Sequence, residues 1–341
     1  MFLNHRNKLV LTAGSVLTAL VFGMGGCKSD LLGEAAIVIP ERMEVRNSIS
    51  RVSKTIGELK RGDEVTIVER TTQAETAYVR IKAPGGLEGW SDARNLAKKI
   101  NLEKSQELAS TIAGMSTQAE CRARASIKVR LTPIRANDDN LIALFPKDTL
   151  FEVVDRENQP KATTQTSAGD EDKDDAKGAK YEVWYKVRLK DNAIVPAGYI
   201  YGGSVELEVP QEIAYFVHPT RKIVGWQKLG TVKDDRGQDN YHYAIFQKAY
   251  NNADEKSDFD YFQVVGFDPK NKSVSYYNVQ RKEVRGVFPV STKIESNRTT
   301  FEFKALDSSN NEQSAQYAVD IDARGHLKMS HLNEAAITSK K

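Results

Sequence analysis

Short segments in which apolar and polar residues alternate fill most of the chain beyond its first 35 residues. Glu64–Val68, Ala77–Ile81 and Trp184–Leu189 alternate with a period of two, which is typical of a strand with one buried face. Gly62-Asp63 and Pro84-Gly85-Gly86 provide turns between such segments. About five short strands in roughly 65 residues, without a helical pattern, predict a small closed β-barrel.

The pattern of this first region occurs a second time. Val45-Arg46 recurs as Val129-Arg130, and Gly89-Trp90 recurs as Gly198-Tyr199. The spacing between the copies grows from 84 residues at the first pair to 109 at the second, so the second copy contains an insertion of about 24 residues. Residues 158–180 contain almost no apolar side chain, and we expect them to form a disordered loop.

The region that joins the copies, 99–120, is predicted to be partly helical. Apolar residues lie at helical spacing from Leu102 to Met115, and Asn101 is the expected N-cap. Residues 210–332 follow a different pattern, in which turn clusters separate aromatic and β-branched stretches; this predicts an antiparallel β-barrel or a curled meander. The expected strands are 213–217, 223–232, 241–249, 261–267, 273–280, 287–294, 299–303 and 316–321. We identify no family for this region, and the tail 333–341 is expected to fray.

The amino terminus differs from the rest of the chain. Arg6 and Lys8 precede an apolar stretch of about 14 residues, and Gly25 and Gly26 stand before Cys27, a pattern typical of a secretory signal over residues 1–26. The stretch is short for a bilayer-spanning helix, which needs about 20 residues. The alternative is a plain secreted protein in which Cys27 has no special role.

Small residues directly before Cys27 resemble the lipobox of bacterial lipoproteins, with Met24 where that family usually has Leu. The resemblance implies cleavage before Cys27, three acyl chains on it, and a tether over residues 27–35. Two buried acyl chains already anchor a protein stably. Lys28 is not the Asp associated with retention in the inner membrane, so we expect a lipid-anchored protein of the cell envelope, at the outer membrane and facing the periplasm or the surface.

Val45-Arg46, Leu59 to Asp63, Val79-Arg80 and Gly89-Trp90 together resemble the bacterial SH3 (SH3b) domain. The second copy resembles it less closely, because Gly198-Tyr199 replaces the usual Gly-Trp. The resemblance implies SH3-like barrels at 36–98 and 121–208 and recognition of cell-wall peptides. The expected fold class is therefore all-β: two small SH3-like barrels, then an antiparallel β-barrel or curled meander at 210–332, with a short connecting helix.

Charge and cysteine content narrow the classes of partner. Without Arg6 and Lys8, 47 basic residues face 46 acidic ones, whereas nucleic-acid-binding proteins carry a clear basic excess. We therefore expect no nucleic-acid partner. Cys121 is the only cysteine besides Cys27, and we expect it to be a buried thiol. The acidic run 170–175 lacks the glycine and the distal glutamate of an EF-hand loop, so we expect a solvated spacer.

No pattern of catalytic residues stands out. A cysteine peptidase needs its nucleophile at a helix start with a histidine in reach, and no such signature surrounds Cys121. A zinc enzyme needs closely spaced ligands, whereas the histidines at 218, 242, 326 and 331 are scattered. We expect no enzymatic activity, no metal and no cofactor.

Aromatic residues of the two barrels are the candidate ligand contacts, because they combine flat apolar area with a polar group. We select Tyr78, Tyr185, Tyr199 and Tyr201, and we expect the last two to point outward on either side of an inward Ile200. Trp90 and Trp184 stand at positions that usually pack a barrel core, so we expect them to be buried.

The sequence thus favours a lipid-anchored, non-enzymatic envelope protein. Its partners would be the membrane, through the N-terminal lipid, and peptidoglycan or envelope peptides, bound by two barrels whose linkage adds avidity. Two alternatives remain. The C-terminal β-barrel would carry a small apolar ligand if a cavity of several hundred Å³ lay among its aromatic residues, or the protein would be a surface adhesin for a macromolecular partner.

Overall fold

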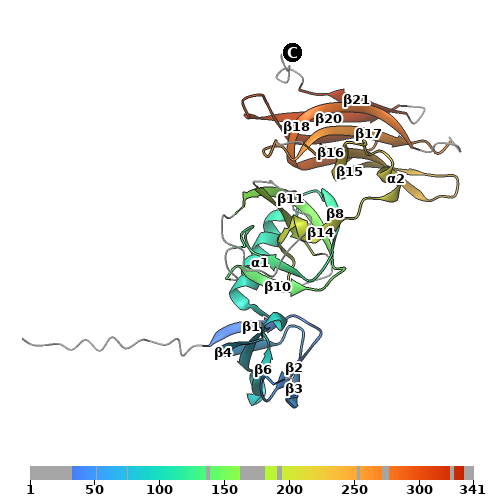
Figure 1. The fold of residues 1–341 in the computed structure, drawn as a ribbon. Coiled ribbons are helices and arrows are strands. Elements are labelled where there is room, and N and C mark those ends of the chain that lie inside the picture. The colour runs from blue at the N-terminus through green and yellow to red at the C-terminus, as the bar shows by residue number, and fades with distance from the viewer. Residues whose placement is uncertain are drawn as a thin grey trace, which may run out of the picture. The chain divides into compact units, whose positions relative to one another are not determined.

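Antiparallel β-sheets make up most of the protein, as the sequence predicted (Figure 1). The computed structural model describes residues 33–50, 52–74, 76–135, 139–161, 181–189, 194–251, 254–270, 276–322 and 326–333. The expected signal peptide, Cys27 and most of its tether lie outside these residues, as do 162–180 of the expected loop and the tail from 334. Neither of the two α-helices among the described residues has the length and apolarity that crossing a bilayer requires.

The first barrel is a seven-stranded sheet with the strand order β3-β2-β6-β5-β4-β1-β7. Its strands are β1 (Glu34–Val38), β2 (Arg42–Arg46), β3 (Thr55–Lys60), β4 (Glu64–Gln73), β5 (Thr76–Lys82), β6 (Glu88–Asp92) and β7 (Leu96–Lys98), with 3-10 turns η1 (Pro84–Gly86) and η2 (Ala93–Asn95). Val45, Val65 and Val79 alternate with outward residues and fill the core. Gly62 has a φ of 90°, a conformation that favours glycine at the tight turn before β4.

The second barrel repeats this topology strand for strand, in the order β10-β9-β13-β12-β11-β8-β14. Its strands are β8 (Ala119–Ala123), β9 (Ile127–Arg130), β10 (Leu141–Phe145), β11 (Leu150–Pro160), β12 (Tyr181–Arg188), β13 (Ala197–Tyr201) and β14 (Val205–Leu207), with a 3-10 turn η3 (Gly202–Ser204). Each strand corresponds to the one seven places earlier, so the repeat read from the sequence is a repeat of structure.

The predicted loop begins too early. Asn158, Gln159 and Pro160 continue strand β11 and pair with Val183, Glu182 and Tyr181 of β12. Asn158 also donates its side-chain amide to the carbonyl of Glu255 at 2.7 Å. Polar composition alone does not prevent a strand here, because backbone pairing and this amide satisfy the polar groups.

Helix α1 (Lys99–Ile112) joins the barrels, but its start differs from the prediction. Lys98 occupies the N-cap position, and Asn101 lies inside the helix with its side chain buried. That side chain donates to the carbonyls of Asp139 at 3.1 Å and Leu141 at 2.7 Å. Tertiary partners have therefore replaced the local capping role that the sequence indicated.

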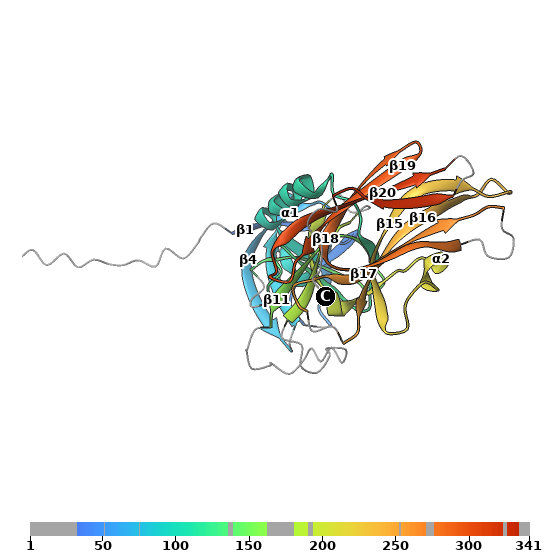
Figure 2. The ribbon, with the colours of Figure 1, turned by 90° about the horizontal axis from the view of Figure 1, so that it is seen from above.

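The C-terminal sheet is a half-barrel of seven strands in chain order (Figures 1 and 2). Its strands are β15 (Arg221–Lys233), β16 (Asp239–Ala249), β17 (Phe259–Phe267), β18 (Tyr276–Glu295), β19 (Arg298–Leu306), β20 (Glu312–Ile321) and β21 (Leu327–His331). The prediction of a strand at 213–217 was wrong, because helix α2 (Gln211–Ala214) begins there after Pro210.

The break predicted between two strands of this sheet was wrong, and one strand was not predicted. The stretches 273–280 and 287–294 belong to one strand, β18, from Tyr276 onward, since the polar residues between them continue the ladder with β17. Strand β21 was missed, and it pairs with β20 from Ile321 to Tyr317. Leu327 and Met329 of β21 are buried and alternate with polar residues, but a strand of five residues leaves only a short pattern in the sequence.

Aromatic rings fill the interior of the half-barrel. Phe262 is fully buried, and its ring centroid lies 5.7 Å from those of Phe301 and Phe303 and 5.0 Å from that of Tyr317. Phe246 lies 5.9 Å from Phe288. These distances are those of packed aromatic pairs. The interior that the carrier hypothesis required to be hollow is occupied at these positions by side chains.

Candidate ligand-binding groove

A cavity of about 420 Å³ opens on the outer face of the first barrel, over strands β2, β5 and β6. Met43 and Val45 of β2 point into the core, so Glu44 and Arg46 between them point outward. The register of strands β2, β5 and β6 places the aromatic residues next to these charged ones, since Trp90 lies opposite Arg46 and Tyr78 lies opposite Asp92. The cavity is lined by Arg42, Met43, Glu44, Arg46, Ser48, Ile49, Tyr78, Trp90, Ser91, Asp92 and Asn95.

Gly89 makes this arrangement possible. A Cβ atom at this position would lie 2.6 Å from the carbonyl oxygen of Arg46, closer than packing allows. Strand β6 therefore approaches β2 closely only with glycine here, and the next side chain, Trp90, is brought to the groove. Gly198 of the second barrel is equally confined, with a Cβ position 2.4 Å from Val129. The paired Gly-aromatic positions are thus explained by close backbone approach.

Charges around the groove are paired within the protein. Arg46 donates to Glu44 at 2.9 Å, which holds the pKa of that carboxyl below its usual value. Burial by itself raises the pKa of Asp92, but the hydrogen bonds and charge of Arg94 outweigh it, so that this pKa is also lowered. Arg42 lies 3.5 Å from Glu58. The groove thus contains two half-buried aromatic rings, and the charged residues around it are paired with one another. Such rings can stack on a sugar or a peptide.

The predicted contact residues of the second barrel are not brought together in one site. Ile200 points inward as expected, and Tyr199, the counterpart of Trp90, remains half-buried opposite Arg130. Tyr201 is only 7% exposed, because the guanidinium of Arg135 lies 3.5 Å from its ring centroid and Trp184 packs at its edge. The expectation that Tyr201 points into solvent was wrong.

Of the remaining predictions about aromatic residues, some were confirmed and others were wrong. Tyr185 packs partly against the core of the second barrel, and burial raises the pKa of its hydroxyl. Trp184 is buried as expected, whereas Trp90 is only half-buried and lines the groove. Arg46 and Glu44 also line the groove and were not predicted as contact residues. The alternation along β2 was the signal that places both on the outer face.

The environment of Cys121 and the placement of possible metal ligands can be described for part of the chain. Cys121 is fully buried, as expected, and burial raises the pKa of its thiol to about 12, so the reactive thiolate is disfavoured. Within the described residues, no three His, Cys, Asp or Glu side chains are placed to hold a metal ion.

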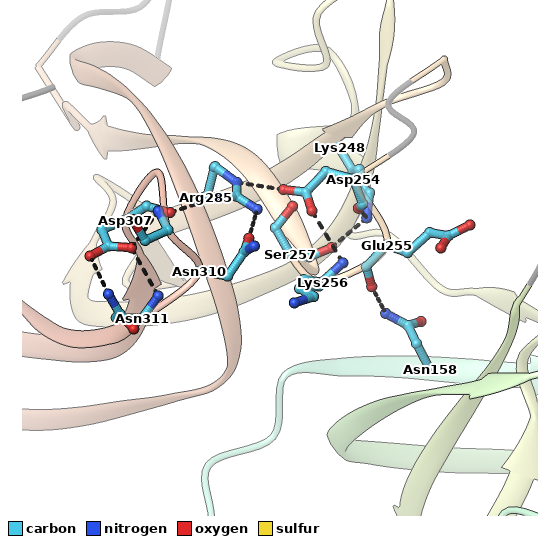
Figure 3. Close-up of polar contacts among 11 residues, drawn as sticks. Asn158, Lys248, Asp254, Glu255, Lys256, Ser257, Arg285, Asp307, Asn310 and Asn311 are labelled. Atoms are coloured by element: carbon cyan, nitrogen blue, oxygen red, sulfur yellow. Dashed lines mark hydrogen bonds and ion pairs between the residues drawn. The ribbon is translucent and has the colours of Figure 1, made fainter. Parts of the chain in front are cut away.

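A second cluster of charged residues surrounds the loop 254–257 (Figure 3). Lys248 is buried and donates to the carbonyls of Asp254 at 2.8 Å and of Ser257. Burial lowers the pKa of Lys248 to about 8. Arg285 donates to the Asp254 carboxylate at 2.6 Å and to the Asp307 carbonyl at 2.7 Å. Because these cations are engaged in fixing loops, we regard the cluster as structural.

Comparison with known proteins identifies the module that carries the groove. Residues 44–97 match the family model of the GW (Gly-Tryp) dipeptide domain. The first barrel is therefore similar to a GW domain. This domain is SH3-like, and GW domains are typical of cell-wall-binding surface proteins. The Gly-Trp pair of the GW domain is Gly89-Trp90 here, and the groove residues from Glu44 to Asn95 all lie within the matched segment.

Similarities to solved structures are distant. NlpC1 from Trichomonas vaginalis is 11% identical, with 51% of this chain and 45% of that chain covered and a TM-score of 0.16, so the chain spans less than half of that protein. A putative autolysin from Listeria monocytogenes is 12% identical, with coverage of 86% and 96% and a TM-score of 0.17. NlpC2 from Trichomonas vaginalis is 9% identical, with coverage of 88% and 96% and a TM-score of 0.16. No curated protein matches the chain.

Proposed function

We propose that the protein is a lipid-anchored, non-enzymatic component of the cell envelope that binds peptidoglycan through its GW domain. The observation that carries this proposal is the groove in which Tyr78 and Trp90 present their rings beside the paired charges of Arg46 and Glu44. The GW match supports association with the cell wall or cell surface. The resemblance of the residues before Cys27 to a lipobox supports the anchor.

The chemistry of the groove suits a glycan or its peptide. A sugar ring or a peptide plane that stacks on Trp90 or Tyr78 buries apolar surface and makes van der Waals contacts with the aromatic ring. Because the nearby arginines are already paired with carboxylates, a polyanion would have to compete with those acids, whereas a ligand with balanced charge would not. A tether on the membrane would hold this groove within reach of the adjacent wall and raise the local concentration of its ligand.

Co-sedimentation of the full mature protein with purified peptidoglycan tests the proposal. We expect wild-type protein to pellet with the wall, and both Trp90→Ala and Tyr78→Ala to bind about tenfold more weakly, corresponding to a loss of about 1.4 kcal/mol. Tyr250→Ala is the matched control, since Tyr250 is a tyrosine 69% exposed in the turn that follows β16. Equal pelleting of wild type and Trp90→Ala, or of neither above background, would contradict the proposal.

A further inference from the structure

A second cavity, of about 540 Å³, lies on the second barrel at the place that corresponds to the GW groove. Its floor includes Tyr199, which pairs with Arg130 as Trp90 pairs with Arg46. Helix α1 supplies one wall, whereas the described residues that line the GW groove include none from an α-helix. The cavity is lined by Asn101, Lys104, Leu108, Leu131, Thr132, Ile134, Asp139, Asn140 and Tyr199.

Both walls of this second groove are fixed by hydrogen bonds. The buried Asn101 side chain ties α1 to the carbonyls of Asp139 and Leu141, and Ser105 donates to the Ala197 carbonyl of β13 at 2.5 Å. The side chain of Asn140 holds the opposite wall in place by hydrogen bonds. Its amide donates to the Ile134 carbonyl at 3.0 Å, and its side-chain oxygen accepts from Arg130 at 2.8 Å. A groove whose walls are set in advance loses little entropy when it binds.

The chemistry of the second groove differs from that of the first. Leu108, Leu131, Ile134 and Tyr199 make it largely apolar, and Ile134 is 52% exposed although an aliphatic side chain of this size gains by burial. Lys104 stands on the rim and makes no ion pair with any described residue. The first groove, by contrast, pairs its arginines with carboxylates.

We propose that the second groove binds a short extended peptide in which an apolar side chain is followed by a carboxylate. The apolar side chain lies between Leu108 and Ile134, and the carboxylate pairs with Lys104, which forms no ion pair with a described residue although Asp139 also lines the cavity. An open groove of this volume holds a few residues of extended chain. The inference concerns a different groove and ligand from the GW domain, so that either proposal can fail while the other stands.

Methyl NMR of the full mature protein, with labelled isoleucine and leucine, tests this inference. The probes are acetyl-Ala-Val-Leu with a free carboxylate, the same peptide as its carboxamide, and acetyl-Ala-Val-Leu-Asp-carboxamide. We expect the first probe to shift the methyl signals of Ile134 and Leu108 with a dissociation constant below about 1 mM, and its carboxamide to bind about tenfold more weakly. Binding of the third probe would assign the carboxylate to an acidic side chain, and its failure would assign it to a chain end.

Matched variants separate the groove from the rest of the surface. Ile134→Asp should abolish the shifts of Leu108, while Ile294→Asp, at a residue 58% exposed on β18, should not. Lys104→Gln should remove the preference for the free carboxylate, while Lys147→Gln, on an exposed turn of the same barrel, and Trp90→Ala should keep it. The inference is overturned if no probe shifts the Ile134 methyl at 5 mM, roughly five times the largest expected dissociation constant, or if Ile134→Asp binds as the wild type does.

Discussion

His242 shows how one side chain makes the folded state sensitive to pH. It is 1% exposed, and its Nδ1 accepts a hydrogen bond from the backbone N–H of Phe267 at 3.0 Å. No described residue bonds its Nε2. Burial disfavours the charged imidazolium and lowers the pKa of His242 from 6.5 to about 4. The neutral ring is thus the form that the fold accommodates.

This shift predicts a loss of stability in acid. Below pH 6.5 the unfolded chain takes up a proton at this residue and the folded protein does not, until the pH falls to about 4. The free energy of unfolding should therefore fall through this window by up to about 1.4 kcal/mol per pH unit. His242→Gln, which keeps an acceptor, should flatten this part of the profile in urea titrations.

The control for this prediction is His326→Gln, because the His326 side chain is 61% exposed. It should leave the slope of stability against pH as it is in the wild type. An unchanged slope in His242→Gln would mean that other groups account for the acid sensitivity of the fold.

At the scale of elements, helix α1 decides how the two barrels differ. It is a weakly amphipathic connector in the sequence, yet it packs on the second barrel through the buried side chains of Leu102, Ser105 and Ile112. Among the described residues, no α-helix lines the groove of the first barrel. The same topology therefore carries an open, charge-compensated groove in one copy and a walled, apolar groove in the other.

Asn101 is the residue on which this docking depends most directly. Asn101→Ala removes two hydrogen bonds at a position 4% exposed, and we expect it to lower the free energy of unfolding by about 1–3 kcal/mol. Gln106→Ala, on the exposed face of α1, should change it by less than about 0.5 kcal/mol. Chemical denaturation measures both, and equal effects would show that Asn101 does not fasten the helix.

At the scale of the whole molecule, the second barrel and the C-terminal sheet share one apolar core. A single cluster joins Phe151 and Val187 of the barrel to Tyr243, Ile245 and Val265 of the sheet. Besides this apolar contact, polar groups cross the boundary. Arg156 of β11 lies 3.4 Å from the buried Asp258, and Asn158 reaches the loop that Lys248 and Arg285 hold in place (Figure 3).

Gln118 is the central polar contact of this junction. Its backbone N–H bonds to Val153 of β11, and its side chain both donates to the carbonyl of Val290 in β18 and accepts from the N–H of that residue, each at 2.9 Å. Its own carbonyl accepts from Trp226 of β15 at 2.8 Å. The side-chain amide thus acts as an additional backbone partner for β18.

Removing that amide should weaken the coupling of barrel and sheet. Gln118→Ala leaves the buried N–H and carbonyl of Val290 without these partners, and we expect a loss of about 2–4 kcal/mol together with a broader or divided thermal transition. Calorimetry measures both. Gln238→Ala, at an exposed turn, should retain the wild-type transition. A single unshifted transition in Gln118→Ala would show that apolar contacts alone join the two parts.

Much of the fold follows from local pattern. Alternation marked the core strands of both barrels, because a strand buries every second side chain whatever its partners are. The repeated Val-Arg and Gly-aromatic pairs identified the two copies. Gly89 and Gly198 occur at equivalent positions because a neighbouring strand approaches each of them too closely for a side chain. The all-β class and the chain-order meander needed no more than strands separated by turns.

Long-range contacts decided the rest. The capping role expected of Asn101, the solvent exposure expected of Tyr201 and the break expected within β18 were wrong for one reason: each depends on residues far away in the sequence, namely Leu141, Arg135 and the ladder of β17. The groove itself arises only where register brings Trp90 beside Arg46 and Tyr78 beside Asp92. The sequence by itself determined where the strands lie and that their side chains alternate between two faces. Only the tertiary structure decided which of those are covered and which meet in a groove, because burial is a property of neighbours and not of local spacing.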